Sequence, residues 1–237
     1  MRTGTITLST ADGPMVLYEA VPDDPRAAVI VIQEAYGVND YIERVARDLA
    51  EAGYHAVAPH LYHRTGGEIV PYDDIQKAVE MIATLDDDKE LMDADAAIEH
   101  LRAAGFADRS IGIVGFCMGG RMTFLVAARR AIGAGVGFYG GAIVPGWAPK
   151  FAALAGECET LEAPWLGLFG DKDMSIPVEQ VEELRGALKA APVETEIVRY
   201  PEAGHGFHSE PRASFVPDAA ADAWSRTLEW FARHLAR

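Results

Sequence analysis

Cysteine is scarce in this sequence, where only Cys117 and Cys158 occur among 237 residues. Two cysteines in so long a chain do not form a disulfide framework, which favours a reducing compartment. The segment Met1–Thr10 alternates Thr with Ile and Leu and has no charged start followed by an apolar block, so it does not resemble a signal peptide. We therefore expect a cytoplasmic protein.

Positively charged residues are also few in this sequence. Lys and Arg number 21 against 36 Asp and Glu, so the formal net charge is -15, and no basic stripe gathers the cations. Because nucleic acids and anionic membrane surfaces both favour positive charge, we expect neither as a partner. The longest uncharged stretch, Ala131–Pro149, is interrupted by glycine and proline. It predicts a strand and a loop rather than a membrane span.

Apolar residues are present in ordinary amount, at 49% hydrophobic against 24% charged, which is typical of a globular protein. No repeat or linker divides the chain, so we expect residues 1–237 to form one domain. Strand-like apolar runs alternate with helical patterns. This alternation predicts an α/β fold with a mostly parallel central sheet and helices on both faces.

The boundaries of the expected elements follow from apolar periodicity and from Gly, Pro and capping residues. A helix at Asp40–Ala52, for example, has Asn39 as its N-cap and ends at Gly53. The segment His60–Tyr72 is expected to be a loop. Strands are expected at Thr3–Ser9, Met15–Val21, Ala27–Ile32, Tyr54–Ala58, Ser110–Val114, Gly135–Tyr139, Trp165–Gly170 and Glu194–Tyr200. The other helices are expected at Asp73–Thr84, Asp86–Ala104, Met118–Ile132, Pro177–Ala190 and Pro217–Ala236.

The sharpest local signal has the form strand, then G-x-C-x-G, then helix. It occurs at Ile111–Gly120 with Cys117 in the central position, and it is a nucleophile-elbow pattern with Cys where Ser is usual. Gly115 and Gly119 allow neighbouring backbones to pass closely. The turn also places the sulfur at a helix N-terminus, which favours a thiolate. The pattern predicts that Cys117 is a nucleophile, the alternative being an inert buried cysteine.

An acid and a histidine follow the elbow in the order that this pattern requires. The strand Trp165–Gly170 leads into a loop with Asp171 and Asp173, and we prefer Asp173 because Pro177 can start the next helix. Asp171 remains the alternative acid. If it does not have that role, we expect it to stabilise the turn by hydrogen bonds to local N–H groups. His205 lies between two glycines after the last expected strand. Together Cys117, Asp173 and His205 predict nucleophile, orienting acid and general base.

Other polar residues have simpler interpretations. Cys158 lies in an acidic segment that raises a thiol pKa, and we expect it to be a bystander. His208 is expected to be structural or to lie at the rim of the site. The histidines near residue 60 lack metal-ligand spacing, and the glycines around Gly135 do not form a phosphate loop, so we expect no metal and no cofactor.

Four motifs taken together resemble the dienelactone hydrolase family. They are Gln33–Gly37, Gly115–Gly120, Asp173–Pro177 and Ala203–Phe207, and the likeness runs from about Ala27 to the end of the chain. The resemblance implies an α/β-hydrolase fold and a triad of Cys117, Asp173 and His205. It also implies an oxyanion hole formed by the backbone N–H groups of Ala35 and Met118, and a Glu34 that contacts the resting thiol and helps to form the thiolate.

The substrate contacts are less well defined. We expect Tyr36, Phe116, Tyr139 and Trp147 either to line an apolar pocket or to pack in the core, with His208 at its rim. In the family, arginines hold a substrate carboxylate, one of them a few residues after the catalytic histidine, where this chain reads Phe207–Glu210. Candidate substitutes are Arg64, Lys77, Arg121 and His208. We therefore expect neutral esters or lactones to be better substrates than anionic ones.

The pattern as a whole predicts a carboxylic ester hydrolase that acts on a small ester or lactone through a thioester acyl-enzyme, as a monomer or small homo-oligomer. Two alternatives belong to other classes. One is a ligand-binding protein on a hydrolase scaffold, which an intact triad argues against. The other is a thiol redox protein, which is disfavoured because no resolving cysteine lies near Cys117 in sequence.

Overall fold

A computed structural model describes residues 1–147 and 149–235 of the chain. Its centre is an eight-stranded sheet with the order β1-β2-β4-β3-β5-β6-β7-β8. Strand β2 is antiparallel to both of its neighbours, and the remaining pairs are parallel. The predicted mostly parallel sheet is confirmed. The strands are β1 (Arg2–Thr10), β2 (Gly13–Val21), β3 (Ala27–Ile32), β4 (Tyr54–Pro59), β5 (Ile111–Phe116), β6 (Ala134–Phe138), β7 (Trp165–Gly170) and β8 (Thr195–Tyr200).

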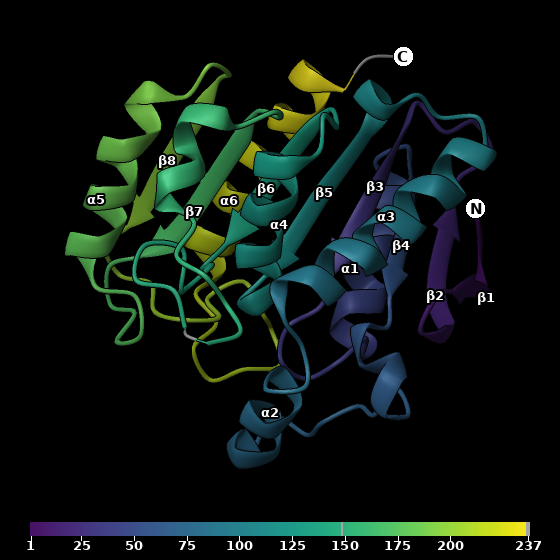
Figure 1. Cartoon of the computed structure of the whole chain (residues 1–237), viewed down its shortest axis with the longest axis horizontal. Helices are drawn as coiled ribbons and strands as arrows, with labels where there is room; N and C mark the ends of the chain where they lie inside the picture. Colours follow the sequence, from purple (N-terminus) through teal and green to yellow (C-terminus); the bar gives the residue numbers. More distant parts are fainter. Residues whose placement is uncertain (148, 236–237) are drawn as a thin grey trace.

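Helices cover the sheet on both faces, and Figure 1 shows α4 in front of it and α6 behind it. Helix α2 lies beyond the edge at which the parallel strands end (Figure 1). The helices are α1 (Asp40–Glu51), α2 (Ile75–Ile82), α3 (Asp87–Ala103), α4 (Met118–Arg129), α5 (Val178–Ala187) and α6 (Pro217–His234), with short 3-10 helices at Leu61–Thr65, Asp108–Ser110, Ala155–Thr160 and Leu188–Ala190.

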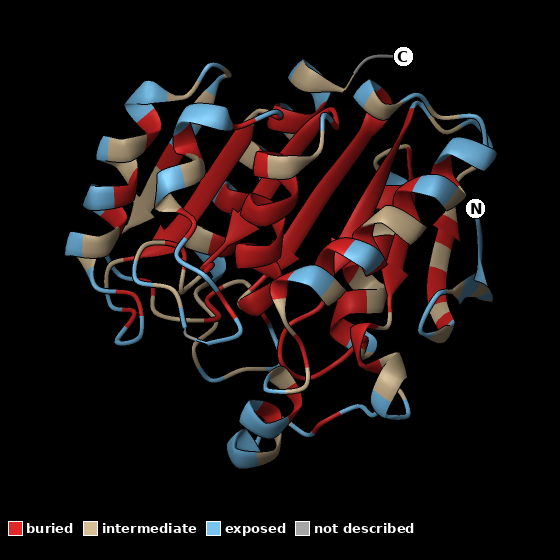
Figure 2. Ribbon diagram, in the orientation of Figure 1, coloured by how far each residue is buried: buried red, intermediate tan, exposed pale blue. Residues whose placement is uncertain are grey.

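The central strands are buried on both faces, as Figure 2 shows. Every residue of β3, β4, β5, β6 and β7 is buried. Such strands read as continuous apolar runs because helices cover both of their faces. The edge strand β1 is mostly exposed and alternates only near its end.

Local capping sets the helix boundaries, and some of them differ from expectation. Asn39 accepts a hydrogen bond from the Ile42 amide at 3.3 Å, as expected of the α1 N-cap. Helix α2 is shorter than predicted because Asp74 caps it at Lys77 N, so that it begins at Ile75. A 3-10 turn occupies part of the segment expected to be a loop.

The last helix ends at His234, and its expected end, Ala236, lies outside the described residues. Ala148 also lies outside the described residues. It belongs to the uncharged stretch that was expected to form a strand and a loop, and β6 is the strand in that stretch. Among the described helices, none combines the length and the apolar character that crossing a membrane requires.

Candidate active site

Cys117 stands on a strained turn between β5 and α4. Its backbone angles are φ 57° and ψ -119°, a left-handed conformation that residues other than glycine rarely adopt. A Cβ on Gly115 would collide with the Gly119 carbonyl, and a Cβ on Gly119 would collide with the backbone of Gln33. The two glycines therefore allow α4 to begin directly against β3 and β5, and the expected close approach is confirmed.

His205 is held by Asp173 across two loops that follow β7 and β8. Its Nδ1 lies 2.7 Å from Asp173 Oδ2, while Asp173 Oδ1 accepts hydrogen bonds from Ser175 N at 2.8 Å and Ser175 Oγ at 2.6 Å. Both side chains of the pair extend from the carboxyl ends of parallel strands, which meet at one edge of the sheet. The pairing fixes Nδ1 toward the acid and leaves Nε2 for chemistry.

The charges around His205 favour its protonated form. Burial alone would lower the pKa of His205, but the neighbouring Cys117 and Asp173 together raise that pKa to about 10. For Asp173, burial is outweighed by its hydrogen bonds from His205 and Ser175, and the pKa of Asp173 is lowered. An ionised Asp173 beside an imidazolium is the electrostatic arrangement that a triad uses.

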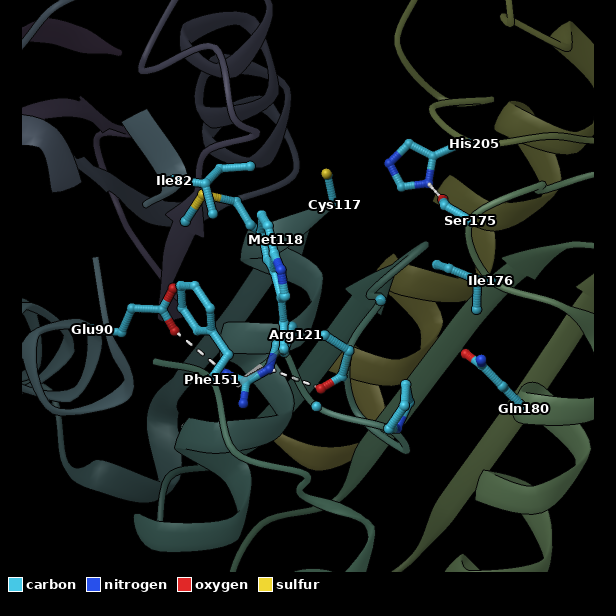
Figure 3. Close-up of a pocket in the computed structure, with 15 residues that line it drawn as sticks. Ile82, Glu90, Cys117, Met118, Arg121, Phe151, Ser175, Ile176, Gln180 and His205 are labelled. Atoms are coloured by element: carbon cyan, nitrogen blue, oxygen red, sulfur yellow. Dashed lines mark hydrogen bonds and ion pairs between the residues drawn. The ribbon is translucent and has the colours of Figure 1, made fainter. Parts of the chain in front are cut away.

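Cys117 and His205 open into the same cavity, which has a volume of about 370 Å³. Figure 3 shows the Cys117 sulfur and the His205 ring at one side of this cavity, with Ser175 beside the ring. The walls are largely apolar, and Trp147, one of the expected aromatic side chains, lies among them. A small ester can therefore reach the sulfur and the imidazole together.

Among the described residues, the wall of this cavity includes neither the alternative acid, Asp171, nor the expected bystander, Cys158. Asp171 is bound by Arg199, whose Nε and Nη2 lie 2.7 and 2.8 Å from the two carboxylate oxygens. That contact joins the loop after β7 to β8 and keeps Asp171 away from His205. Cys158 is buried in the 3-10 helix Ala155–Thr160, and burial raises the pKa of its thiol to about 11.

Two backbone amides are suited to an oxyanion hole. Met118 is the first residue of α4, a position whose N–H has no intrahelical acceptor. Among the described residues, the Ala35 N–H donates no turn or loop hydrogen bond. Both residues follow strands that are neighbours in the sheet, β5 and β3. These are the two donors that the family resemblance implied.

Glu34 lies at the centre of a polar cluster that sequence reasoning did not find. Its Oε1 accepts from Arg212 Nη1 at 3.3 Å and from the Tyr139 hydroxyl at 3.4 Å, and its Oε2 accepts from the Tyr72 hydroxyl at 3.4 Å. Burial raises the pKa of Glu34, with Arg212 and His205 acting in the opposite direction. Within the described part of the chain the hydrogen bonds of the Glu34 carboxylate go to Arg212, Tyr139 and Tyr72 and none goes to Cys117, so the implied contact with the thiol is not present as a hydrogen bond in this structure.

Several side chains expected at the substrate lie elsewhere. Phe116 is completely buried and packs against Phe138 with ring centroids 4.8 Å apart, because it points into the core rather than toward the cavity. Tyr139 is also buried, and its ring centroid lies 5.1 Å from that of His205. Tyr36 lies beneath Arg212, 5.6 Å from the ring centre to the guanidinium carbon.

His208 is half-buried beside the site. Its Nδ1 lies 2.7 Å from the Tyr41 hydroxyl, and burial lowers the pKa of His208 to about 3. A neutral imidazole cannot serve as the cation for a substrate carboxylate, so this role, considered from sequence, does not fit His208.

The other candidate cations are already paired with acids. Arg64 binds Asp93 with two nitrogens at 2.8 and 2.9 Å, Lys77 pairs with Glu68 at 3.1 Å, and Arg121 pairs with Asp87 at 2.5 Å. The cation nearest to the expected position is Arg212, seven residues after His205. Sequence reasoning missed Arg212 because it lies farther from the histidine than the segment Phe207–Glu210, where the family pattern places the arginine. Its position directly after Pro211 was the one sequence feature that marked it.

One group of side chains outside the site has the donors that a metal ion needs. His55 Nε2 and His100 Nε2 lie 3.2 and 2.8 Å from Glu19 Oε1, and the three donor atoms lie within 4.8 Å of one another. His55 is near the start of β4, so this group lies at the opposite end of the sheet from Cys117. In the structure His55 and His100 each form a hydrogen bond with Glu19.

Comparison with known proteins identifies a family. The profile of the dienelactone hydrolase family matches residues 15–235. A Methylorubrum extorquens protein provisionally named carboxymethylenebutenolidase is 37% identical over 236 residues, covering 98% of this chain and 81% of that protein. A Bradyrhizobium protein provisionally named 2-oxo-3-(5-oxofuran-2-ylidene)propanoate lactonase is 38% identical over 212 residues, covering 88% of this chain and 84% of that protein.

A solved structure gives the same result in three dimensions. It is a Klebsiella pneumoniae protein provisionally named dienelactone hydrolase, with 37% sequence identity, a TM-score of 0.89 and 98% of each chain covered. The sequence profile, the relatives and the solved structure each cover most of the chain. The chain belongs to the dienelactone hydrolase family.

Proposed function

We propose that this member of the family hydrolyses small carboxylic esters or lactones through a thioester formed on Cys117. Membership of the family supports a hydrolase of esters or lactones. The single observation that carries the mechanism is the Asp173–His205 pair, which opens into the same cavity as a cysteine at the N-terminus of α4. A nucleophile, a base and an orienting acid in that arrangement perform acyl transfer.

The reaction would proceed in two balanced steps. The Cys117 thiolate attacks the substrate carbonyl, and the amides of Met118 and Ala35 stabilise the oxyanion. The intermediate collapses to a thioester, and the imidazolium of His205 protonates the departing alkoxide. His205 then removes a proton from water, which attacks the thioester and releases the acid together with the Cys117 thiolate, and the proton remains on His205.

The proposal predicts an acyl group on Cys117 during turnover. We expect rapid mixing with a p-nitrophenyl ester, followed by acid quenching and peptide mass spectrometry, to find the acyl group on the peptide that contains Cys117. The expected burst of p-nitrophenol has an amplitude close to the enzyme concentration if deacylation is the slower step. Turnover with an acyl group only on another peptide would exclude Cys117 as nucleophile, and binding without turnover would favour the ligand-binding alternative.

A further prediction concerns the charge of the substrate. The expected preference for neutral substrates was based on the lack of an arginine near the catalytic histidine, and Arg212 changes that premise. The chain does contain an arginine near the site, but Glu34 already neutralises it at 3.3 Å. We therefore expect the wild type to prefer the methyl ester of a lactone acid over its free carboxylate. In Glu34→Gln, the unpaired Arg212 should shift the ratio of the two kcat/KM values toward the carboxylate by about tenfold.

The ratio separates binding from catalysis, since any general loss of rate in Glu34→Gln affects both substrates equally. The double variant Glu34→Gln/Arg212→Gln should return the ratio to the wild-type value. A ratio that is the same in all three proteins would show that Arg212 does not recognise the substrate charge. The measurements should be made at constant ionic strength, because the net charge of -15 repels anions most at low salt.

A further inference from the structure

Glu90 has a buried carboxyl group without a hydrogen-bond partner. It lies in the first turn of α3, and its side chain is 1% exposed. Within the described part of the chain neither of its carboxyl oxygens makes a hydrogen bond, and Oε2 is completely enclosed. The nearest cation is Arg121, whose Nη1 lies 3.9 Å from Oε2, beyond hydrogen-bond distance. A buried polar group without a partner is costly, and such groups are rare in folded proteins.

Arg121 forms an ion pair with Glu90 at 3.9 Å but donates no hydrogen bond to it, because other acceptors occupy its guanidinium group. Its Nε donates to the Ala142 carbonyl at 3.0 Å, its Nη1 to Asp87 Oδ1 at 2.5 Å and its Nη2 to the Ala152 carbonyl at 2.6 Å. Asp87 already supplies the counter-charge of Arg121, and its Oδ2 also accepts from the Ala152 amide at 3.0 Å. The charge of Arg121 is therefore balanced without Glu90.

Glu90 forms part of the wall of the cavity that contains Cys117 and His205. Figure 3 shows Glu90 and Arg121 at the side of the cavity away from His205, with Met118 between Glu90 and Cys117 in this view. Most of the wall that joins the two sides is apolar and includes Ile82, Met118, Trp147, Phe151 and Ile176. A substrate with its carbonyl at Cys117 would therefore extend along apolar side chains toward Glu90.

We propose that Glu90 forms a distal subsite that binds a hydroxyl group at the far end of an ester or lactone substrate. The inference depends on the proposed function, because it needs Cys117 to be the point at which the substrate carbonyl reacts. Three observations support the subsite: an enclosed carboxyl without a hydrogen bond, an arginine whose hydrogen bonds go to Asp87 and to backbone carbonyls, and a shared cavity with an apolar path between the two ends.

A hydroxyl group fits this position better than a charged group. Burial, opposed by Arg121 and assisted by Asp87, Asp93 and Asp86, raises the pKa of Glu90 to about 8. At pH 7 the side chain is then mainly a neutral acid, which can both donate to and accept from a hydroxyl. A substrate ammonium or carboxylate would have to lose its hydration in this largely apolar cavity, where Arg121 and Asp87 already pair with each other, and burying such a charge costs far more than burying a hydroxyl.

The test compares γ-lactones that carry an alkyl side chain with the same lactones carrying a terminal hydroxyl, over a series of chain lengths. Release of acid is measured in a pH-stat at pH 7. We expect the wild type to prefer the hydroxylated lactone by about tenfold in kcat/KM at one chain length, because an alkyl end would cover the Glu90 carboxyl without pairing it. Absence of a hydroxyl preference at every length would overturn the proposal without any variant.

The variants identify the residue that provides the preference. Glu90→Gln should retain much of it, because the amide also donates and accepts, whereas Glu90→Leu should reverse it in favour of the alkyl chain. Gln180→Leu is the matched control, since Gln180 is another neutral polar side chain in the wall of the same cavity. A preference that is lost in Gln180→Leu and kept in Glu90→Leu would assign the hydroxyl to Gln180 and refute the Glu90 subsite.

Failure of the subsite and failure of the proposed function give different results. Unsubstituted γ-butyrolactone is too short to extend across the cavity, so all three variants should hydrolyse it at the wild-type rate. If the wild type hydrolyses it and a Cys117→Ala variant does so equally well, the proposed nucleophile fails, whatever Glu90 does. Circular dichroism and thermal unfolding of Glu90→Leu establish that it is folded. If it is not, the wild type and Gln180→Leu still test the subsite, because absence of a hydroxyl preference in the wild type, or its loss in Gln180→Leu, would overturn the proposal.

Discussion

Replacement of Cys117 by alanine is expected to remove ester and lactone hydrolysis, with a loss of about 10⁴-fold or more in kcat. The reason is that the variant retains the oxyanion donors and the Asp173–His205 pair but has no atom to form the acyl bond. Cys117→Ser should also retain little activity, since a hydroxyl requires stronger deprotonation than this site provides. The measurement is the rate of p-nitrophenyl acetate hydrolysis, with circular dichroism to verify the fold.

Cys158→Ala is the matched control for that experiment. Cys158 is buried, and burial raises the pKa of its thiol to about 11, so it should neither react nor contribute to the rate. Iodoacetamide should therefore inactivate the wild type and Cys158→Ala at the same rate and label the peptide that contains Cys117. Wild-type activity in Cys117→Ala would refute the nucleophile assignment outright.

The second large effect is expected at Asp173. Asp173→Asn should lower kcat by about 10²- to 10⁴-fold, because an amide favours the wrong tautomer of His205 and no longer stabilises the imidazolium. Cys117 and Asp173 both raise the pKa of His205, and the same His205–Asp173 contact helps to lower the pKa of Asp173, while burial opposes the charge of both groups. The measurement is kcat and kcat/KM for a p-nitrophenyl ester across pH 5–9.

Asp171→Asn provides the comparison, because Asp171 comes from the same loop but binds Arg199 instead of the histidine. We expect this variant to lose some stability and little activity, since the contact is part-exposed and lies between β7 and β8. Larger activity loss in Asp171→Asn than in Asp173→Asn would mean that the wrong carboxylate had been assigned to His205.

The order and local form of the chemical motifs were readable from the sequence because short-range geometry dictates them. A strand that ends in Gly-x-Cys-x-Gly before a helix leaves few backbone paths, and Gly115 and Gly119 are required where the chain segments touch. The same holds for the alternation of strands and helices, which predicts a mostly parallel sheet whichever residues fill its core. The choice of Asp173 over Asp171 was also made from local sequence, and the structure brings Asp173 to His205.

Contacts between distant segments were decided only by the tertiary structure. Arg212 forms a hydrogen bond with Glu34, which lies 178 positions away in the sequence. Arg121 lies closer to Asp87 than to Glu90, although both acids belong to the first turn of α3. No local pattern encodes such a choice, because it depends on how helices and loops from separate parts of the chain pack together. Phe116 illustrates the same limit, since whether it points to the cavity or to the core depends on which way the strand faces once the sheet has formed.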